Sequence, residues 1–179
     1  MNVATIFAGG TGQRMKTAAC PKQFLKLYGK PIIIYTLEVF QQHPAIDHII
    51  VACVSGWEDR LEKMCTKLYK IVQGGKDTQE SKLNALYGLA DLCQDDDIVL
   101  MHDAVRPMIT AQLISDNIEA VKKYGSAITA DPFTETGVVS TDGVTVESTI
   151  ERSKLYIAKA PQSFYYKDVL WAHEQGKSM

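Results

Sequence analysis

The chain has 179 residues, which suits one domain, and 46% of them are apolar, enough for a single sizeable core. A formal net charge of −2 and a pI of about 6.1 exclude a broadly basic, nucleic-acid-binding protein. The amino terminus has no secretory signal pattern and no apolar run is long enough to span a membrane, so no membrane partner is expected. Four cysteines at irregular spacings, without a C-x-x-C pair, predict reduced thiols packed inside a cytoplasmic protein.

Apolar, β-branched runs of strand length alternate along the chain with segments of helical period. The predicted strands cover residues 3–8, 48–54, 70–75, 97–104 and 126–131. Predicted helices start after Pro31, span 57–68 and 78–93, and run from a cap at Thr110 to Gly125. Near-continuous apolar strands joined by helices predict an α/β fold: a doubly wound, mostly parallel sheet covered on both faces.

The pattern changes after residue 131. "TGVVSTDGVTVEST" (136–149) is two alternating runs around Asp142-Gly143, which predicts a β-hairpin. We expect residues 134–152 to form a protruding arm of a single domain that covers 1–179. "KLYIAKA" is expected to return to the sheet, and a last helix is predicted from Tyr166 to Glu174.

Unusual residues follow three of the predicted strands. They are the loop in "TIFAGGTGQRMKTAACPKQFL" (5–25), "QGGKDTQES" (73–81) and "MHDAVRP" (101–107). Taken singly, strand-end glycines are often only tight turns and a His-Asp pair is often a satisfied polar cluster. Ligands of such sheets bind beyond the carboxyl ends of the strands, so the three segments together favour one site. Within it, His102 is expected to support its turn rather than to transfer protons.

The first loop fits neither of two familiar phosphate-binding patterns. It lacks the third glycine of G-x-G-x-x-G, and no Gly-Lys-Ser/Thr closes a P-loop. Its glycines still allow backbone N–H groups to approach a phosphate chain. Arg14 and Lys22 supply cations suited to a spread triphosphate charge, and Asp103 is a plausible Mg²⁺ ligand beside substrate phosphates. The loop therefore predicts a nucleoside triphosphate site.

Four motifs occur together and in order, namely G-G-x-G-x-R-M (9–15), P-K-Q-F-L (21–25), H-D-A-V-R-P (102–107) and A-P-Q-S-F (160–164). In combination they resemble the cytidylyltransferase group that contains methylerythritol-phosphate and ribitol-5-phosphate cytidylyltransferases. The resemblance covers almost the whole chain. It implies transfer of CMP from CTP to an alditol phosphate with release of pyrophosphate, with Mg²⁺ as cofactor.

The resemblance also implies roles for individual residues. Arg14 and Lys22 would be the catalytic cations. Nucleotide binding would fall to Ala8, Gly9, Gly10, Thr11, Gly12, Gly75 and Ser81. Acceptor binding would fall to Asp103, Arg106, Thr136 and Arg152, with Asp103 also on the metal. Because the family's arm residues reach into a neighbouring subunit's site, Thr136 and Arg152 imply a homodimer.

Three features depart from the family pattern. Ala160 replaces the family's threonine before Pro161, and Glu135 stands where aspartate is usual before Thr136. Members normally continue with a segment that carries an acceptor-binding lysine, and that segment is expected to be absent here.

The acceptor is left open between two branches of the group. The Arg14-to-Lys22 spacing is one residue longer than is common in the methylerythritol branch, and "PKQFL" and "GKPIIIYTLEVF" also favour ribitol 5-phosphate, a precursor for wall or capsule polymers. Methylerythritol phosphate, and hence isoprenoid synthesis, is the alternative. A non-catalytic CTP- or CDP-binding subunit is a more remote one. The incomplete glycine fingerprint disfavours a dehydrogenase, and the absence of a D-x-D at a strand's carboxyl end disfavours a glycosyltransferase.

Overall fold

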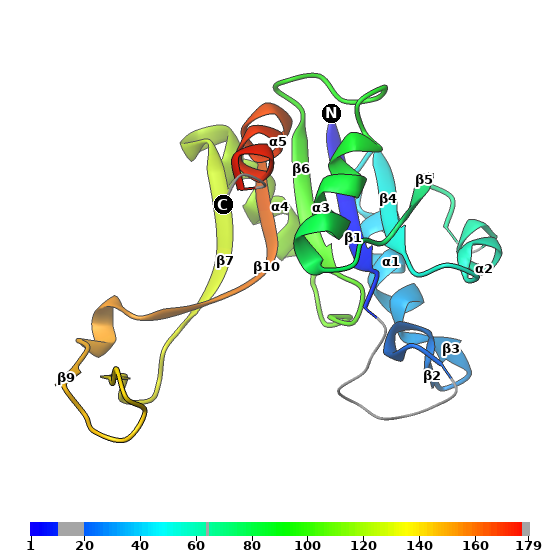
Figure 1. Ribbon diagram of the computed structural model, residues 1–179. Coiled ribbons are helices and arrows are strands. Elements are labelled where there is room, and N and C mark those ends of the chain that lie inside the picture. Colours follow the sequence, from blue (N-terminus) through cyan, green and yellow to red (C-terminus); the bar gives the residue numbers. More distant parts are fainter. Residues whose placement is uncertain (11–19, 64, 177–179) are drawn as a thin grey trace.

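A six-stranded sheet forms the centre of the protein, and the computed structural model describes residues 1–10, 20–63 and 65–176 (Figure 1). The strand order is β5-β4-β1-β6-β10-β7. The strands are β1 (Asn2–Ala8), β4 (His48–Cys53), β5 (Leu68–Gln73), β6 (Ile98–Asp103), β7 (Ser126–Pro132) and β10 (Tyr156–Tyr165). β1 pairs in parallel with β4 and β6, and β4 with β5, whereas β10 is antiparallel to both β6 and β7. The predicted α/β, mostly parallel fold is confirmed.

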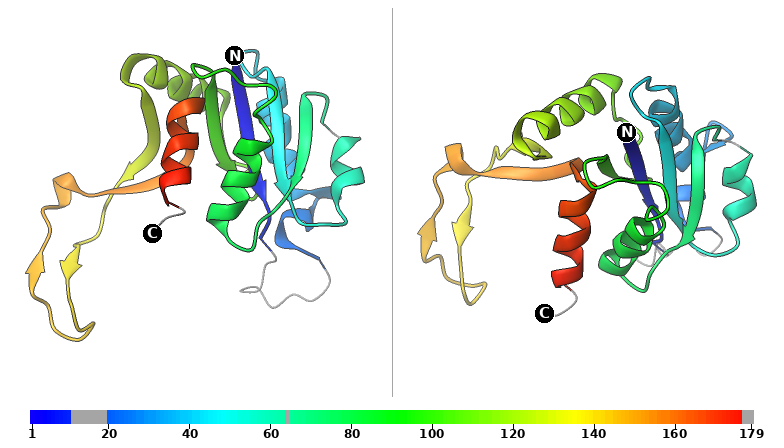
Figure 2. Two further views of the ribbon diagram at one scale, coloured as in Figure 1. Left: turned by 45° about the horizontal axis from the view of Figure 1, so that its top comes forward. Right: turned by 90° about the horizontal axis from the view of Figure 1, so that it is seen from above.

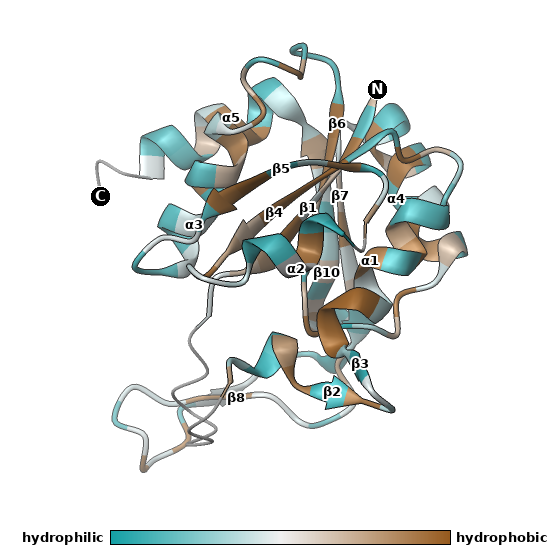
Figure 3. Cartoon of the chain, turned by 90° about the vertical axis from the view of Figure 1, so that its right-hand side faces the viewer, coloured by the Kyte–Doolittle hydropathy of each residue, from teal (hydrophilic) through white to brown (hydrophobic). Residues whose placement is uncertain are grey.

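Helices cover both faces of this sheet, as the view from above shows (Figure 2). One face carries α1 (Ile32–Gln42) and α4 (Ala111–Tyr124), and the other carries α3 (Thr78–Tyr87) and α5 (Tyr166–Gln175). Two buried clusters result, and β1 contributes to both: Ala4 and Ile6 pack toward α1 and α4, whereas Val3 packs toward α3 and α5. Because both faces are covered, the central strands β1 and β4 are apolar along most of their length (Figure 3). No helix within the described ranges is long and apolar enough to cross a bilayer.

Local signals place several element ends correctly. The Thr110 hydroxyl accepts a hydrogen bond from the Leu113 N–H at 3.2 Å and begins α4, and Gly125, at φ 87°, ends it. Pro31 immediately precedes α1. In the α3 region the helix ends at Tyr87, and the chain continues in turns to the buried Cys93. The helix predicted over 78–93 is therefore shorter than expected, and Ala90, beyond its end, is exposed.

The prediction of a helix over residues 57–68 is wrong. The helix α2 covers only Glu58–Glu62, and Leu68 already belongs to β5, where it pairs with Ile49. The Lys67 ammonium donates to the carbonyls of His43 and Ile46, both at 2.7 Å, which fixes the chain beside β4. Tertiary pairing thus overrides the local helical pattern.

The expected arm leaves the body between β7 and β10 (Figure 1). Its pairing is limited to β8 (Val138–Val139) and β9 (Ser148–Thr149), and the short 3-10 helix η3 (Arg152–Lys154) follows. The arm turns where the Asp142 carboxylate accepts hydrogen bonds from the N–H groups of Val144 and Thr145. The hairpin is therefore present, with shorter strands than the alternation suggested.

The described cysteines behave as packing residues. Cys53, Cys65 and Cys93 are buried, and none of the four is in a disulfide. Burial, with smaller contributions from Glu58 and Asp97, raises the pKa of Cys53 and Cys93 to about 12. Their thiols therefore stay protonated and unreactive.

Candidate active site

A pocket of about 760 Å³ opens at the carboxyl ends of β1, β5 and β6. This volume suits a nucleotide-sized ligand. All three segments singled out in the sequence contribute to its lining. The predicted site residues in that lining are Ala8, Gly9, Gly10, Lys22, Gly75, Ser81, Asp103 and Arg106. The remaining lining residues are Phe7, Gln23, Lys76, Asp77, Thr78, Ala104 and Val105.

The loops after β1 and β5 meet over the end of β4. A Cβ atom added to Gly74 would lie 2.9 Å from the Cα of Gly9 and 3.3 Å from the Cys53 carbonyl oxygen. The Gly74 N–H donates to that same carbonyl at 2.7 Å. Glycine is therefore required at position 74 because two backbones touch there, and the contact brings both glycine segments to one pocket.

The segment before α3 is folded by its own side chains. The Ser81 hydroxyl donates to the Asp77 carbonyl at 2.8 Å and accepts from the Gly75 N–H at 2.9 Å. The Asp77 carboxylate caps α3 by accepting from the Glu80 N–H at 2.8 Å. The first turn of α3 thus lies at the pocket, where its partial positive charge favours an anionic ligand. Ser81 lines the pocket and holds the glycine turn.

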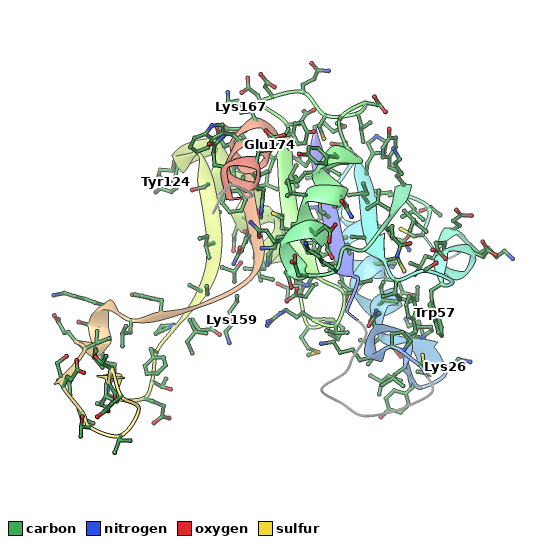
Figure 4. The ribbon with its side chains drawn as sticks, in the orientation of Figure 1. Lys26, Trp57, Tyr124, Lys159, Lys167 and Glu174 are labelled. Atoms are coloured by element: carbon green, nitrogen blue, oxygen red, sulfur yellow. The ribbon has the colours of Figure 1, made fainter. Side chains whose placement is uncertain are left out.

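Lys22 enters the pocket from the 3-10 helix η2 (Lys22–Phe24). The next residue, Gln23, is only 1% exposed, and its side-chain amide donates to the carbonyls of Ala8 at 2.5 Å and Gly10 at 3.1 Å. Phe24 stacks on Trp57, with ring centroids 4.2 Å apart. Figure 4 places Trp57 beside the segment that carries η2 and Lys26.

Asp103 ends β6 and Arg106 lies in the turn that follows, where the Arg106 Nε donates to the Asp103 carboxylate at 2.5 Å. Both side chains are about half exposed. The buried His102 contacts the Arg106 carbonyl through Nε2 at 3.0 Å. Burial lowers the pKa of His102 more than that carbonyl and the Asp103 charge raise it, so the ring is neutral and donates from Nε2. His102 thus supports the turn, as expected from the sequence.

The two arm residues lie outside the pocket of their own chain. Thr136 and Arg152 are exposed, and an Arg152 guanidinium nitrogen lies 3.5 Å from the Thr136 hydroxyl. The arm therefore brings the two predicted acceptor ligands together. Thr11, Gly12 and Arg14 fall outside the described residues.

Sequence reasoning missed several contributors to the pocket. Lys76 was not singled out, although a lysine beside a Gly-Gly turn at a strand end was a usable signal. Gln23 gave no local signal, because a glutamine in a loop usually faces water.

The arrangement suits binding of a polyphosphate. Among the residues that the structure describes, the cationic side chains of Lys22, Lys76 and Arg106 line the pocket together with the α3 terminus and the glycine backbone. Within the described ranges no group of three His, Cys, Asp or Glu side chains could hold a metal ion by itself. The half-exposed Asp103 carboxylate is the donor type that Mg²⁺ combines with substrate phosphates, so the residues present fit such a site.

Comparisons with known proteins identify the family. Residues 2–179 match the family model described as IspD, 2-C-methyl-D-erythritol 4-phosphate cytidylyltransferase. The chain is 47% identical to a ribitol-5-phosphate cytidylyltransferase of Vibrio parahaemolyticus, covering 99% of this chain and 76% of that protein. It is 44% identical to a protein of the same name from Streptococcus agalactiae, covering 95% and 73%.

Solved structures of the same family resemble this chain in fold. The Francisella tularensis 2-C-methyl-D-erythritol 4-phosphate cytidylyltransferase has a TM-score of 0.81 at 30% identity, with 99% of this chain and 79% of that one covered. A 4-diphosphocytidyl-2C-methyl-D-erythritol synthase of Anaerococcus prevotii has a TM-score of 0.83 at 26% identity, covering 99% and 75%. The chain therefore belongs to the 2-C-methyl-D-erythritol 4-phosphate cytidylyltransferase family and is a CTP-dependent nucleotidyltransferase.

Proposed function

We propose that this enzyme transfers CMP from CTP to ribitol 5-phosphate, giving CDP-ribitol and pyrophosphate. The observation that carries the acceptor assignment is the similarity, at 44–47% identity, to proteins named for ribitol 5-phosphate. The two solved relatives reported above, which are named for the methylerythritol substrate, are 26% and 30% identical. Methylerythritol phosphate remains the alternative acceptor.

The chemistry needs placement and charge stabilisation rather than a strong base. An anionic oxygen of the acceptor's phosphate attacks the α-phosphorus of CTP, and the bond from that phosphorus to the β-phosphate bridging oxygen breaks. The electron pair leaves with pyrophosphate. A phosphate monoester is already an anionic nucleophile near neutral pH, so in-line positioning and neutralisation of charge supply the catalysis.

We assign the charge on the α-phosphate and the leaving pyrophosphate to Lys22 and Arg14. The placement of Lys22 in the pocket lining supports the first assignment, and the loop motif supports the second. Asp103 would hold Mg²⁺, which when bound supplies charge neutralisation across the phosphates. Arg106, beside Asp103, would bind the incoming phosphate.

The arm would complete the acceptor site of a second subunit in a homodimer. Thr136 and Arg152 lie together on the arm but away from their own pocket. The arm also exposes apolar side chains, among them Val138 at 52%, Val144 at 86% and Val146 at 63%. Such a patch is typical of a surface that pairs with another chain. Because CTP is consumed, we place the reaction in the cytoplasm.

A pyrophosphate-release assay tests the proposal. The full gene product would be incubated with CTP and Mg²⁺, with ribitol 5-phosphate and methylerythritol 4-phosphate in parallel reactions. We expect release with ribitol 5-phosphate at a kcat/KM at least about tenfold higher, which corresponds to about 1.4 kcal/mol of discrimination. Release with methylerythritol phosphate alone would overturn the acceptor assignment. CTP binding without release from either would favour a binding subunit.

A further inference from the structure

We infer that Gln23 is a positioning residue that fixes Lys22 relative to the glycine loop of the triphosphate site. The inference rests on the proposed function, because it takes Lys22 as the cation that stabilises the reacting phosphates. Gln23 has no charge and no acid–base chemistry to offer. Its importance follows from what its amide holds.

The Gln23 amide joins two segments of the chain. It donates to the carbonyl of Ala8, the last residue of β1, at 2.5 Å and to that of Gly10 at 3.1 Å. Both partners are carbonyl oxygens, so only the NH₂ group of the side chain can face them. With 1% exposure, no bulk water is available to replace these bonds. The amide therefore sets the separation between η2 and the start of the loop.

The segment to which Gln23 is tied lies in the interior of the sheet. β1 is flanked by β4 and β6, and Ala8 pairs with Cys53 while Phe7 pairs with Asp103. The Ala104 N–H donates to the Phe7 carbonyl at 3.0 Å. These bonds and the Gln23 amide together fix the position of Lys22 relative to Asp103 in the pocket.

The other side of η2 is held by an aromatic stack. Phe24 is 4% exposed and stacks on Trp57 at an interplanar angle of 15°. The Phe24 N–H donates to the Pro21 carbonyl at 2.9 Å, which closes the turn around Lys22. Lys22 is therefore carried by a turn fixed on both sides, so the backbone position from which its side chain enters the pocket is set before substrate binds. Misplacing a reacting group by about 1 Å can lower a rate by about 10²-fold.

A double-mutant cycle tests the inference. Gln23→Met keeps the side chain's length and volume and removes both donors. In the parent we expect kcat to fall by about 10–10²-fold, with the KM for the alditol phosphate unchanged. In a Lys22→Ala background, the same substitution should change kcat by less than about threefold, because no ammonium is left to position.

Matched variants separate positioning from stability. Asn117 is another buried amide, 5% exposed, that donates to the Leu113 carbonyl at 3.0 Å and the Thr129 hydroxyl at 3.1 Å, and it does not line the pocket. Asn117→Leu should lower the unfolding temperature and leave kcat within about twofold. If Gln23→Met does not fold, Gln23→Asn replaces it in the double-mutant cycle with Lys22→Ala, because it keeps the amide but shortens its reach.

Each result has a distinct meaning. Near-normal kcat in Gln23→Met, with Lys22→Ala inactive, would overturn the positioning role and leave the proposed function intact. Equal losses in the parent and in the Lys22→Ala background would also overturn it, because Gln23 would then act independently of Lys22. Near-normal turnover in Lys22→Ala itself would instead contradict the catalytic role assigned to Lys22, on which the inference rests, while absence of pyrophosphate release from the parent would contradict the proposed function.

Discussion

Gly9 and Gly74 touch through their backbones, although one follows β1 and the other follows β5. The space between them is so small that a Cβ on Gly74 would lie 2.9 Å from the Cα of Gly9. β4 lies between these two strands in the sheet, so the loops must reach over its end to meet. The contact is what turns two separate glycine motifs into one pocket wall.

Gly74→Ala should therefore destabilise the protein by about 1–3 kcal/mol, because backbone rather than a flexible side chain opposes the added methyl group. Urea unfolding measures this. Gly10→Ala is the control for stability, since a Cβ there would meet no atom within 4 Å among the described residues. Equal stability of both variants would show that the two loops separate at little cost.

Lys22→Ala should keep the fold and lower kcat by about 10²–10³-fold, as expected when one group that stabilises developing charge is removed. The pyrophosphate-release assay measures it. Lys26→Ala is the control, because Lys26 is exposed on β2 (Lys26–Leu27) and does not line the pocket. Near-normal turnover of the Lys22 variant would refute the catalytic assignment.

Arg152→Ala should raise the KM for the alditol phosphate and leave CTP binding intact, because the arm is proposed to reach the acceptor of a partner subunit. Lys154→Ala, in the same 3-10 helix and paired with Glu151, is the control. Mixing the Arg152→Ala and Lys22→Ala proteins should restore activity above that of either alone. A mixed dimer then holds one site with an intact Lys22 and an intact arm. No recovery on mixing would contradict arm exchange.

Asp97 should contribute stability that is lost in acid. Burial raises its pKa, but hydrogen bonds from the Met1 ammonium and the Gln94 N–H, with the ammonium charge, lower the pKa below the ordinary 3.8. A lowered folded-state pKa means that the stabilisation is complete above pH 3.8 and disappears as pH falls through the lowered value.

Asp97→Asn should therefore cost about 1.5–3 kcal/mol at pH 7, with the difference from the parent shrinking below pH 3.8. Unfolding free energies across this pH range measure it. Asp96→Asn is the control, since Asp96 is exposed where it pairs with Lys167 and should change stability by under about 1 kcal/mol. A pH-independent Asp97 effect would argue against the ion pair.

Local signals in the sequence sufficed for much of the fold. Apolar runs located the strands, and a capping threonine and a left-handed glycine located the ends of α4. The strand-end motifs also identified the pocket: the predicted residues that the structure describes all line it, apart from Thr136 and Arg152 on the arm. These features could be predicted because each depends on a residue's own backbone preference or on a short periodic pattern.

Only the tertiary structure decided which residues far apart in the sequence contact one another. Leu68 became a strand residue because Ile49 lay beside it, and β10 was inserted antiparallel between β6 and β7. Asp97, which follows two other aspartates in the sequence, is only 8% exposed and is paired with the amino terminus. Gln23 is buried and joins two segments because η2 packs against the end of β1. The sequence by itself determined which segments become strands, helices and phosphate-binding loops, because those depend on local backbone preferences. Only the folded structure decided which groups meet across the pocket, because that depends on packing over the whole chain.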